Sequence, residues 1–402
     1  MKAMLNLDVI REATRLTRAG QLVEATALLQ RMLRGDRVLD APSRLEDRIA
    51  LTGREPLTID AKADTVEGTD SPQQAKPAAA HLRTLRASLD RKNGRAGIGL
   101  RGVTKRAPLS KPDIVPDGTR FIEGTYSNPA GSRAFKLFIP SRYQERPLPL
   151  VVMLHGCTQS PDDFAAGTRM NFIAEEQNCF VVYPAQHSRA NPAKCWNWFR
   201  TADQQRGSGE PALIAGITRQ IMQSYLVDRK RVYVAGLSAG AAAAAIMGAT
   251  YSDLYAAIGI HSGIACGVAT DLPSALAAMK QGGPPGREII LGDRQPVPTI
   301  VFHGDRDTTV HPNNGGQILE QSVNTMVTQK KVHHGHVPGG HTYTRTVLSD
   351  ASGHKMLEHW NIHGAGHAWS GGSPAGSYTD PRGPDATREI LRFFLEHSLP
   401  VE

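Results

Sequence analysis

A serine, two aspartates and a late histidine are the residues of this chain whose types and spacing could carry out chemistry together. The segment GLSAG at 236–240 follows the apolar run RVYVA and precedes a run of alanines. This pattern predicts a strand, a sharp turn and a helix, the arrangement that presents a reactive serine hydroxyl. Gly236 and Gly240 fit it because larger side chains there would collide with the neighbouring strand and helix. The plainer alternative is that Ser238 only caps the helix.

A nucleophilic serine needs a base to take its proton and an acid to orient that base. Where the nucleophile lies on such a turn, the acid and then the histidine follow it along the chain. Asp305 and Asp307 come just after the run PTIVFHG, and His367 lies in the loop GAGHAWSGG after a predicted strand, MLEHWNI. We predict that His367 is the base and that Asp307 orients it. Asp305 is the alternative, and the unused aspartate would bond its own turn.

Two backbone amides should hold the negative oxygen that forms when a serine attacks a carbonyl carbon. One amide follows the nucleophile, and the other lies in the loop after an earlier strand. These positions are Ala239 and Cys157, the latter just beyond the run PLVVMLHG. The predicted chemistry is therefore acyl transfer through an acyl-enzyme.

Aromatic residues near these loops could line a substrate cleft. Trp196, Trp198 and Trp369 would give it apolar walls suited to short hydroxyacyl units. Packing in the core is an equally good interpretation of each. The segment 271–295 is long for a connection, and we expect it to form a small cap over the cleft.

A group of histidines at 333, 334, 336 and 341 could in principle hold a metal ion. No carboxylate or cysteine nearby completes a set of ligands. We therefore expect a hairpin with solvent-facing imidazoles and predict no metal site.

The four cysteines allow one disulfide that would matter for the site. Cys179 begins its predicted strand, whereas Cys157, Cys195 and Cys266 lie at or beyond the carboxyl ends of theirs. A five-residue strand spans about 17 Å, so Cys179 should be a buried free thiol. Our preferred bridge joins Cys157 to Cys195 and would attach the predicted oxyanion loop to the segment CWNWF. The alternative keeps all four cysteines reduced.

Uniform apolar runs must supply the strands that position these residues. Runs of this kind are buried on both faces, as in a parallel sheet. Between them, apolar residues from Leu213 to Leu226 recur at helical spacing and predict a helix packed on the sheet. The sequence thus predicts an α/β three-layer sandwich with a mostly parallel sheet, whose ligands gather at the strands' carboxyl ends. The runs are 149–156, 179–184, 231–237, 254–263 and 298–304, preceded by an antiparallel pair at 119–127 and 133–141.

The 402 residues divide into three predicted regions. Residues 1–37 have apolar positions at helical spacing on both sides of Gly20, which predicts a helical hairpin. Residues 38–116 are rich in proline, alanine, glycine and basic residues without periodicity, which predicts a flexible linker. Residues 117–402 hold every candidate described above and form the predicted catalytic domain.

Composition and charge exclude several classes of protein. With 40% hydrophobic and 21% charged residues the chain has the balance of a globular protein, and no stretch approaches the ~20 apolar residues of a membrane span. Most of the net charge of +8 belongs to residues 1–115, which hold 21 Lys and Arg against 14 Asp and Glu. A nucleic-acid site needs Lys and Arg clustered on its binding surface, and the predicted catalytic domain has no such excess, so no nucleic-acid partner is predicted.

Taken together, the motifs resemble a known family. LHGCTQSPDDFA, CWNWF, GLSAGAAAA, HSGIACG, FHGDRDTTV and GAGHAWSGG with YTDPRGPDAT are similar, in order and spacing, to the polyhydroxybutyrate depolymerase family of esterases. That family also holds feruloyl and acetylxylan esterases. The resemblance covers about residues 120–400 and implies an α/β-hydrolase domain that acts on esters without metal or cofactor. It implies Ser238, Asp307 and His367 as the catalytic residues.

The resemblance favours hydrolysis of poly- or oligo(3-hydroxybutyrate). One alternative is an esterase that releases feruloyl or acetyl groups from carbohydrate. Another is a binding protein whose residues 1–115 attach it to a polymer surface or granule, with esterase activity secondary. Many family members are extracellular, whereas charged residues break the first apolar run too early for a secretory signal. The sequence alone favours the cytoplasm, and the location stays open.

Overall fold

The computed structural model describes residues 114–144, 146–283, 297–322 and 327–400. The predicted hairpin at 1–37 and all but the last residues of the predicted linker at 38–116 lie outside this set. The chain divides into two compact units, Met1–Leu109 and Ser110–Glu402, and every described residue belongs to the second.

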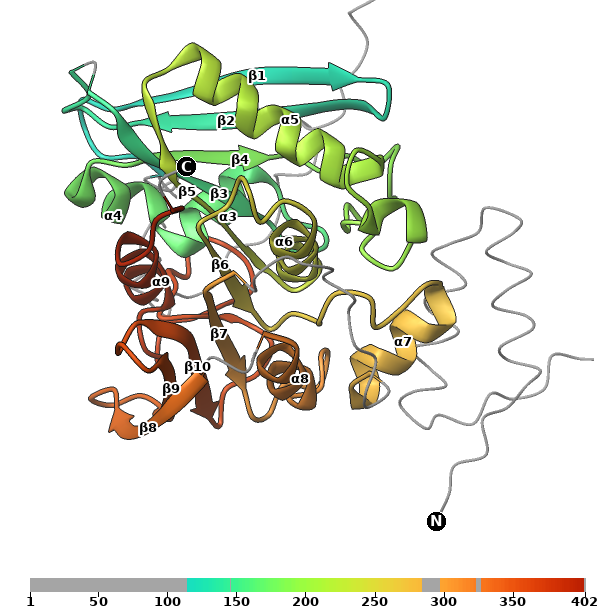
Figure 1. Cartoon of the computed structure of the whole chain (residues 1–402), viewed down its shortest axis with the longest axis vertical. Helices are drawn as coiled ribbons and strands as arrows, with labels where there is room; N and C mark the ends of the chain where they lie inside the picture. The colour runs from blue at the N-terminus through green and yellow to red at the C-terminus, as the bar shows by residue number, and fades with distance from the viewer. Residues whose placement is uncertain (1–113, 145, 284–296, 323–326, 401–402) are drawn as a thin grey trace, which may run out of the picture. The chain divides into compact units, whose positions relative to one another are not determined.

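A ten-stranded sheet forms the centre of the second unit (Figure 1). Its strand order is β1-β2-β4-β3-β5-β6-β7-β10-β9-β8, and the neighbours from β4 to β10 are parallel. Antiparallel strands extend it at both edges, including the β8–β9 hairpin predicted for the histidine group. The strands are β1 Arg120–Asn128, β2 Gly131–Ile139, β3 Leu148–Leu154, β4 Phe180–Pro184, β5 Val227–Leu237, β6 Ala257–His261, β7 Thr299–Gly304, β8 Val327–His336, β9 Thr342–Asp350 and β10 Lys355–His363.

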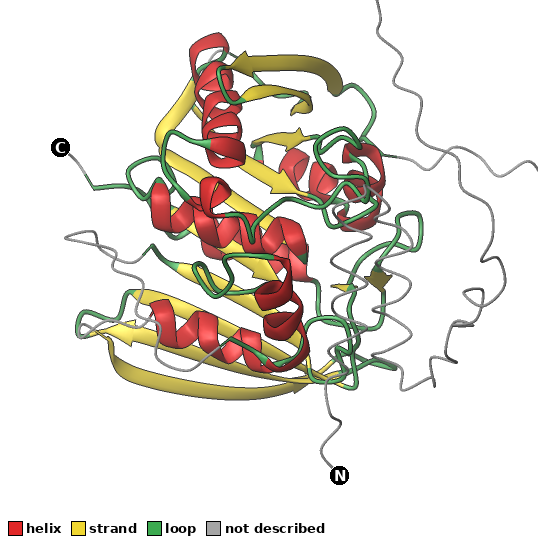
Figure 2. Cartoon of the chain, turned by 90° about the vertical axis from the view of Figure 1, so that its right-hand side faces the viewer, coloured by secondary structure: helices red, strands yellow, loops and turns green. Residues whose placement is uncertain are grey.

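Helices cover both faces of the sheet, and Figure 2 shows those on one face lying across the strands. Side chains of α5 to α8 pack into one core cluster, and side chains of α3, α4 and α9 pack into a second. The predicted three-layer α/β sandwich is thereby confirmed. The helices are α3 Pro161–Thr168, α4 Met170–Gln177, α5 Gly209–Ser224, α6 Ala239–Thr250, α7 Leu272–Gln281, α8 Asn313–Ser322 and α9 Ala386–Leu395, and a short 3-10 turn, η1, spans Thr201–Gln204.

The central strands are apolar at every position because each contributes to both cores. In β3, Leu150, Val152 and Leu154 belong to one cluster, whereas Val151 and Met153 belong to the other. A strand with two buried faces has no solvent side on which a polar residue could lie. The uniform runs in the sequence follow directly from this burial.

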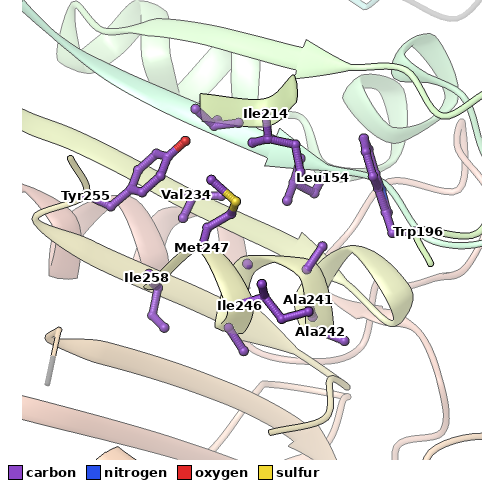
Figure 3. Close-up of a cluster of buried hydrophobic side chains, with 14 of the residues drawn as sticks. Leu154, Trp196, Ile214, Val234, Ala241, Ala242, Ile246, Met247, Tyr255 and Ile258 are labelled. Atoms are coloured by element: carbon purple, nitrogen blue, oxygen red, sulfur yellow. The ribbon is translucent and has the colours of Figure 1, made fainter. Parts of the chain in front are cut away.

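Small residues let α6 pack closely on the strands around it. Its first five positions after Gly240 are alanines, all buried. Figure 3 shows Ile246 and Met247 of this helix among buried side chains that include Val234 of β5 and Ile258 of β6. The helix therefore begins directly on the sheet, at the residue that follows Ser238.

The segment predicted to cap the cleft is described only in part. Its first half is α7, which begins with a capping box formed by Asp271 and Ser274. The amide of His311 donates to the carbonyl of Met279, and Asn314 donates to Ala278, so α7 is attached to the start of α8. Residues 284–296 lie outside the described set, and the cap stays a prediction. Of the helices described, none is long and apolar enough to cross a membrane.

Candidate active site

Ser238 lies on a strained turn between β5 and α6. Its φ of 57° and ψ of −119° are values that residues other than glycine rarely adopt. A Cβ at Gly240 would overlap the carbonyl oxygen of Leu154, and one at Gly236 would overlap the backbone of Gly240. Only glycine fits at these two positions, and the turn holds the half-buried Ser238 side chain at the carboxyl end of β5.

His367 and Asp307 meet at the same edge of the sheet. Nδ1 of the imidazole lies 2.7 Å from Oδ2 of the carboxylate, whose side chain is fully buried. The other carboxylate oxygen accepts hydrogen bonds from the amides of Thr309 and Val310, at 2.9 and 2.8 Å. Burial by itself raises the pKa of Asp307. The hydrogen bond and charge of His367 and the hydrogen bond from the Val310 amide lower it by more, so the pKa of Asp307 lies below its ordinary value.

The other candidate acid, Asp305, has a different histidine partner. Its Oδ2 lies 2.9 Å from Nδ1 of His363, and its Oδ1 accepts a hydrogen bond from the amide of Gly364 at 2.7 Å. Both side chains are more than a third exposed. Asp305 thus ties the loop after β7 to the end of β10, while Asp307 faces His367.

His261 links the serine turn to the histidine loop. It pairs with Leu237 in the sheet, and its carbonyl accepts a hydrogen bond from the amide of Ser238 at 2.9 Å. Burial lowers the pKa of His261 to about 3. Its neutral Nε2 accepts a hydrogen bond from the amide of Ser370 at 3.0 Å, three residues after His367. No hydrogen bond in the described part of the chain joins the side chains of Ser238 and His367 directly.

The two predicted oxyanion donors are the backbone amides of Ala239 and Cys157. Ala239 is the first residue of α6, and Cys157 lies in the loop after β3. Among the described residues neither amide hydrogen has an acceptor, although the amides on both sides of Cys157 are bonded. Gly156 donates to Oε1 of Gln159 at 2.9 Å, and Thr158 donates to the carbonyl of Ala193 at 2.6 Å.

A disulfide joins Cys157 to Cys195. It attaches the loop that carries the first candidate donor to the segment 193–197, beside the Thr158 to Ala193 hydrogen bond. Cys179 and Cys266 are free and buried, as predicted for Cys179, and burial raises the pKa of each thiol to about 12.

The three tryptophans expected to line a cleft lie mostly beneath the site. Trp196 is 0% exposed, and its indole N–H donates to the carbonyl of His155 at 3.1 Å. Trp369 is 1% exposed; it donates to Thr387 and stacks on His261. The prediction that these two contact substrate needs correction, because neither offers exposed surface and both support the loops from inside. Trp198, at 8%, keeps a small exposed area.

The buried carboxylate of Glu210 was missed by sequence reasoning. It accepts hydrogen bonds from the amide and the side-chain nitrogen of Asn197, each at 2.7 Å, and from Nε2 of Gln186. Gln186 in turn donates to the carbonyl of Cys195 at 2.9 Å. Burial, together with the charge of Asp203, raises the pKa of Glu210. Glu210 therefore holds the segment to which the disulfide is attached.

Other histidines either bond to backbone groups or are exposed to solvent. Nε2 of His155 accepts a hydrogen bond from the amide of Gln186 at 3.0 Å, and His303 contacts the carbonyl of Val310 at 2.9 Å. The imidazoles of His333, His334 and His336 on β8 are exposed. Within the described ranges no group of three or more histidine, cysteine or acidic side chains is arranged to hold a metal ion.

A cavity of about 460 Å³ lies elsewhere, between β1, α5 and the end of α6. Tyr126, Arg219 and Tyr251 are among the residues that line it. Because Tyr251 follows the last turn of α6 and Ser238 precedes the first, the two are separated by the length of the helix, about 18 Å. The cavity is thus separate from the site described above.

The fold and this arrangement of residues define an α/β-hydrolase. Residues 133–329 match the family model described as Esterase PHB depolymerase, and this part of the chain belongs to that family. The chain is 34% identical over 250 residues to poly(3-hydroxyalkanoate) depolymerase C of Paucimonas lemoignei, covering 60% of this chain and 59% of the relative.

Other relatives are named as esterases of different substrates. The chain is 27% identical to a probable acetylxylan esterase A of Neosartorya fischeri, over 48% of this chain and 56% of that protein. It is also 27% identical to feruloyl esterase B of Neurospora crassa, over 60% of this chain and 85% of that protein. The chain thus spans less than two thirds of the length of the depolymerase and of this acetylxylan esterase.

A solved structure supports the fold. The acetyl xylan esterase from Aspergillus awamori matches with a TM-score of 0.53 at 19% identity, over 69% of this chain and 99% of that one. At this identity the likeness concerns the α/β-hydrolase fold alone.

Proposed function

We propose that this chain is a serine esterase that hydrolyses carboxylic esters through an acyl-enzyme. The observation that carries the proposal is the 2.7 Å contact between His367 and the buried Asp307, while Ser238 follows the carboxyl end of β5. The strained backbone of Ser238 supports it further, because such strain persists mainly where a function requires it.

The proposed reaction has two halves. Nε2 of His367 takes the hydroxyl proton of Ser238 while the Ser238 oxygen attacks the ester carbonyl carbon. The amides of Cys157 and Ala239 then hold the resulting oxyanion. Asp307 accepts the hydrogen bond of Nδ1 and thereby fixes the tautomer and stabilises the imidazolium. The imidazolium then protonates the departing alcohol, and water attacks the acyl-enzyme in the same way.

Poly- or oligo(3-hydroxybutyrate) is the substrate we favour. The support is the 34% identity to a protein named poly(3-hydroxyalkanoate) depolymerase C. Acetyl or feruloyl esters of carbohydrate are the second candidate, because several relatives carry those names at 24–27% identity. Both candidates use the same proposed catalytic residues and differ in what the site accepts around the ester.

A substrate panel tests the proposal. Wild type and Ser238→Ala are assayed on p-nitrophenyl acyl esters, hydroxybutyrate oligomers and feruloyl esters. We expect wild type to turn over hydroxybutyrate oligomers with the highest kcat/KM and Ser238→Ala to lose about 10³-fold or more. Preference for feruloyl or acetylated substrates would select the second candidate. A wild type without activity on any ester would refute the esterase proposal.

A further inference from the structure

Tyr378 joins the two loops between which an ester would have to bind. The residue is 47% exposed, an unusual exposure for an aromatic residue in the described part of this unit. Its carbonyl accepts a hydrogen bond from the amide of Trp369 at 2.7 Å, two residues after His367. Its hydroxyl lies 3.2 Å from Oγ1 of Thr158, the residue after Cys157.

The direction of the hydrogen bond at Thr158 follows from its surroundings. The single hydroxyl hydrogen of Thr158 is donated to the carbonyl of Cys157, at 2.6 Å. Thr158 can therefore only accept from Tyr378, and the phenol is the donor. This contact holds the ring beside the loop that carries the Cys157 amide, and it leaves the lone pairs of the phenol oxygen available to a ligand.

The backbone at Tyr378 is strained and firmly held on both sides. Its φ is 53°, a value that costs a bulky aromatic residue free energy. On one side the amide of Ser377 donates to Oδ1 of Asp163 at 2.9 Å, and on the other Thr379 Oγ1 donates to the carbonyl of Ser373 at 2.9 Å. The pairing of β11 Trp369–Ser370 with β12 Thr379–Asp380 adds a further restraint. The surroundings thus impose a conformation that keeps the ring at the surface rather than in the core.

We propose that Tyr378 is a specificity-determining residue that binds the aliphatic hydroxyacyl unit next to the reacting ester. The inference rests on the proposed function and deepens it. A tyrosine ring offers an apolar face and a polar tip, which suits a chain that alternates methyl-bearing carbons with ester oxygens. Because the ring connects the oxyanion loop to the loop of His367, an ester held by both contacts it with the unit beyond its carbonyl group.

The test compares a long ester with a short one. The hydroxybutyrate trimer reaches past the reacting carbonyl, whereas p-nitrophenyl acetate carries only two acyl carbons. For Tyr378→Ala we expect the KM for the trimer to rise about tenfold, and the KM for p-nitrophenyl acetate to rise about twofold at most. Tyr378→Phe keeps the ring and should stay within about threefold of wild type for the trimer.

Val332→Ala is the matched control, because Val332 on β8 is 48% exposed and lies outside the site. It should leave both KM values unchanged. Equal rises for the two esters in Tyr378→Ala, or an unchanged KM for the trimer, would overturn the proposal. Thermal unfolding of each variant shows whether a loss follows from misfolding, in which case Tyr378→Phe and Tyr378→Leu provide the comparison.

Binding without turnover separates this inference from the proposed function. Calorimetric titration of the trimer into Ser238→Ala, and into Ser238→Ala with Tyr378→Ala, measures contact with the ring alone. We expect about tenfold weaker binding in the double variant. Should wild type hydrolyse no ester, a tenfold difference here would still support the binding role of Tyr378. Binding that Tyr378→Ala does not change, or that is absent from Ser238→Ala, would refute it.

Discussion

The imidazole of His367 contacts the buried Asp307 at 2.7 Å, whereas Asp305, two residues earlier, is exposed and contacts His363 at 2.9 Å. Both aspartates follow β7, yet the hydrogen bonds of Thr309 and Val310 fold the second one back under the site. A Cβ at Gly304 would overlap the carbonyl of Ala365, which shows how closely the histidine loop lies on the end of this strand.

Replacing each aspartate with asparagine separates their roles. Asp307→Asn should lower kcat on p-nitrophenyl acetate by about 10³-fold or more, because an amide in that position would not fix the tautomer of His367 or stabilise its cation. Asp305→Asn should lower it less than about threefold, since its carboxylate only holds His363 and Gly364. Similar losses in both variants would remove Asp307 from the proposed mechanism.

Reduction of the Cys157–Cys195 disulfide should lower activity. The bond closes a separation of 38 residues, for which the loss of folding free energy is about 2–4 kcal/mol. It also holds the loop of the Cys157 amide, so kcat should fall after treatment with a thiol reductant under native conditions. The other two cysteines are buried free thiols, so the double variant Cys157→Ala with Cys195→Ala should not respond to reductant. Equal responses of the two proteins would contradict this interpretation.

Glu210→Gln should weaken the segment 186–197. The carboxylate accepts hydrogen bonds from three donors on Gln186 and Asn197, and an amide nitrogen would face at least one of them. The free energy of unfolding should fall by about 1–3 kcal/mol, measured by urea denaturation. The exposed Glu320 on α8 provides the control. Glu320→Gln should leave the free energy of unfolding unchanged within about 0.5 kcal/mol.

Stability should fall as the pH is lowered from 7 to 5. Burial lowers the pKa of His155 to about 4 and that of His261 to about 3, so both stay neutral in the folded chain while they gain a proton in the unfolded chain. Each then destabilises the folded state by about 2 kcal/mol at pH 5, and the loss continues until the pH passes through the folded pKa. Burial also lowers the pKa of His359 to about 4, which adds to this loss, whereas it raises the pKa of Asp203 and Glu210, which opposes it. Denaturation curves that do not change between pH 7 and pH 5 would contradict the expectation.

Gly240→Ala should prevent the serine turn from forming. The new methyl group would overlap the carbonyl oxygens of Leu154 and His155. Soluble expression should fall sharply, or the unfolding midpoint should drop by about 8 °C or more. Gly316→Ala in α8 is the control, because nothing lies within 4 Å of its added carbon, and alanine there should stabilise the helix by up to about 1 kcal/mol. A Gly240→Ala protein as stable as wild type would contradict the described turn.

The parts of this molecule that depend on neighbouring residues in the sequence were predictable. The strands around β3 and β5 appear as uniform apolar runs because both of their faces are buried. The turn at Ser238 requires Gly236 and Gly240 because any side chain there would overlap neighbouring backbone. The pairing of Asp307 with His367 followed from the order and spacing of the motifs.

Features that depend on contacts between distant segments were not predictable. Trp196 directly follows Cys195 in sequence, but it is buried, and its indole N–H donates to the carbonyl of His155, 41 residues earlier. In the sequence, Glu210 is one acid in the first turn of a helix, and its hydrogen bonds from Gln186 and Asn197 are visible only in the folded chain. Likewise the strained backbone of Tyr378 is imposed by Asp163 and Trp369, which no local pattern around residue 378 indicates.

The loop of His367 lies far along the chain from Ser238, the residue that we propose it activates. During synthesis on the ribosome, the hydroxyl of Ser238 is made about 130 residues before the imidazole of His367, because only one residue is added at a time. On the proposed mechanism, a nascent chain that ends before this loop lacks the base that Ser238 needs to attack an ester. On the proposed mechanism, the chain is therefore inert until the loop of His367 has been synthesised and lies against the end of β7.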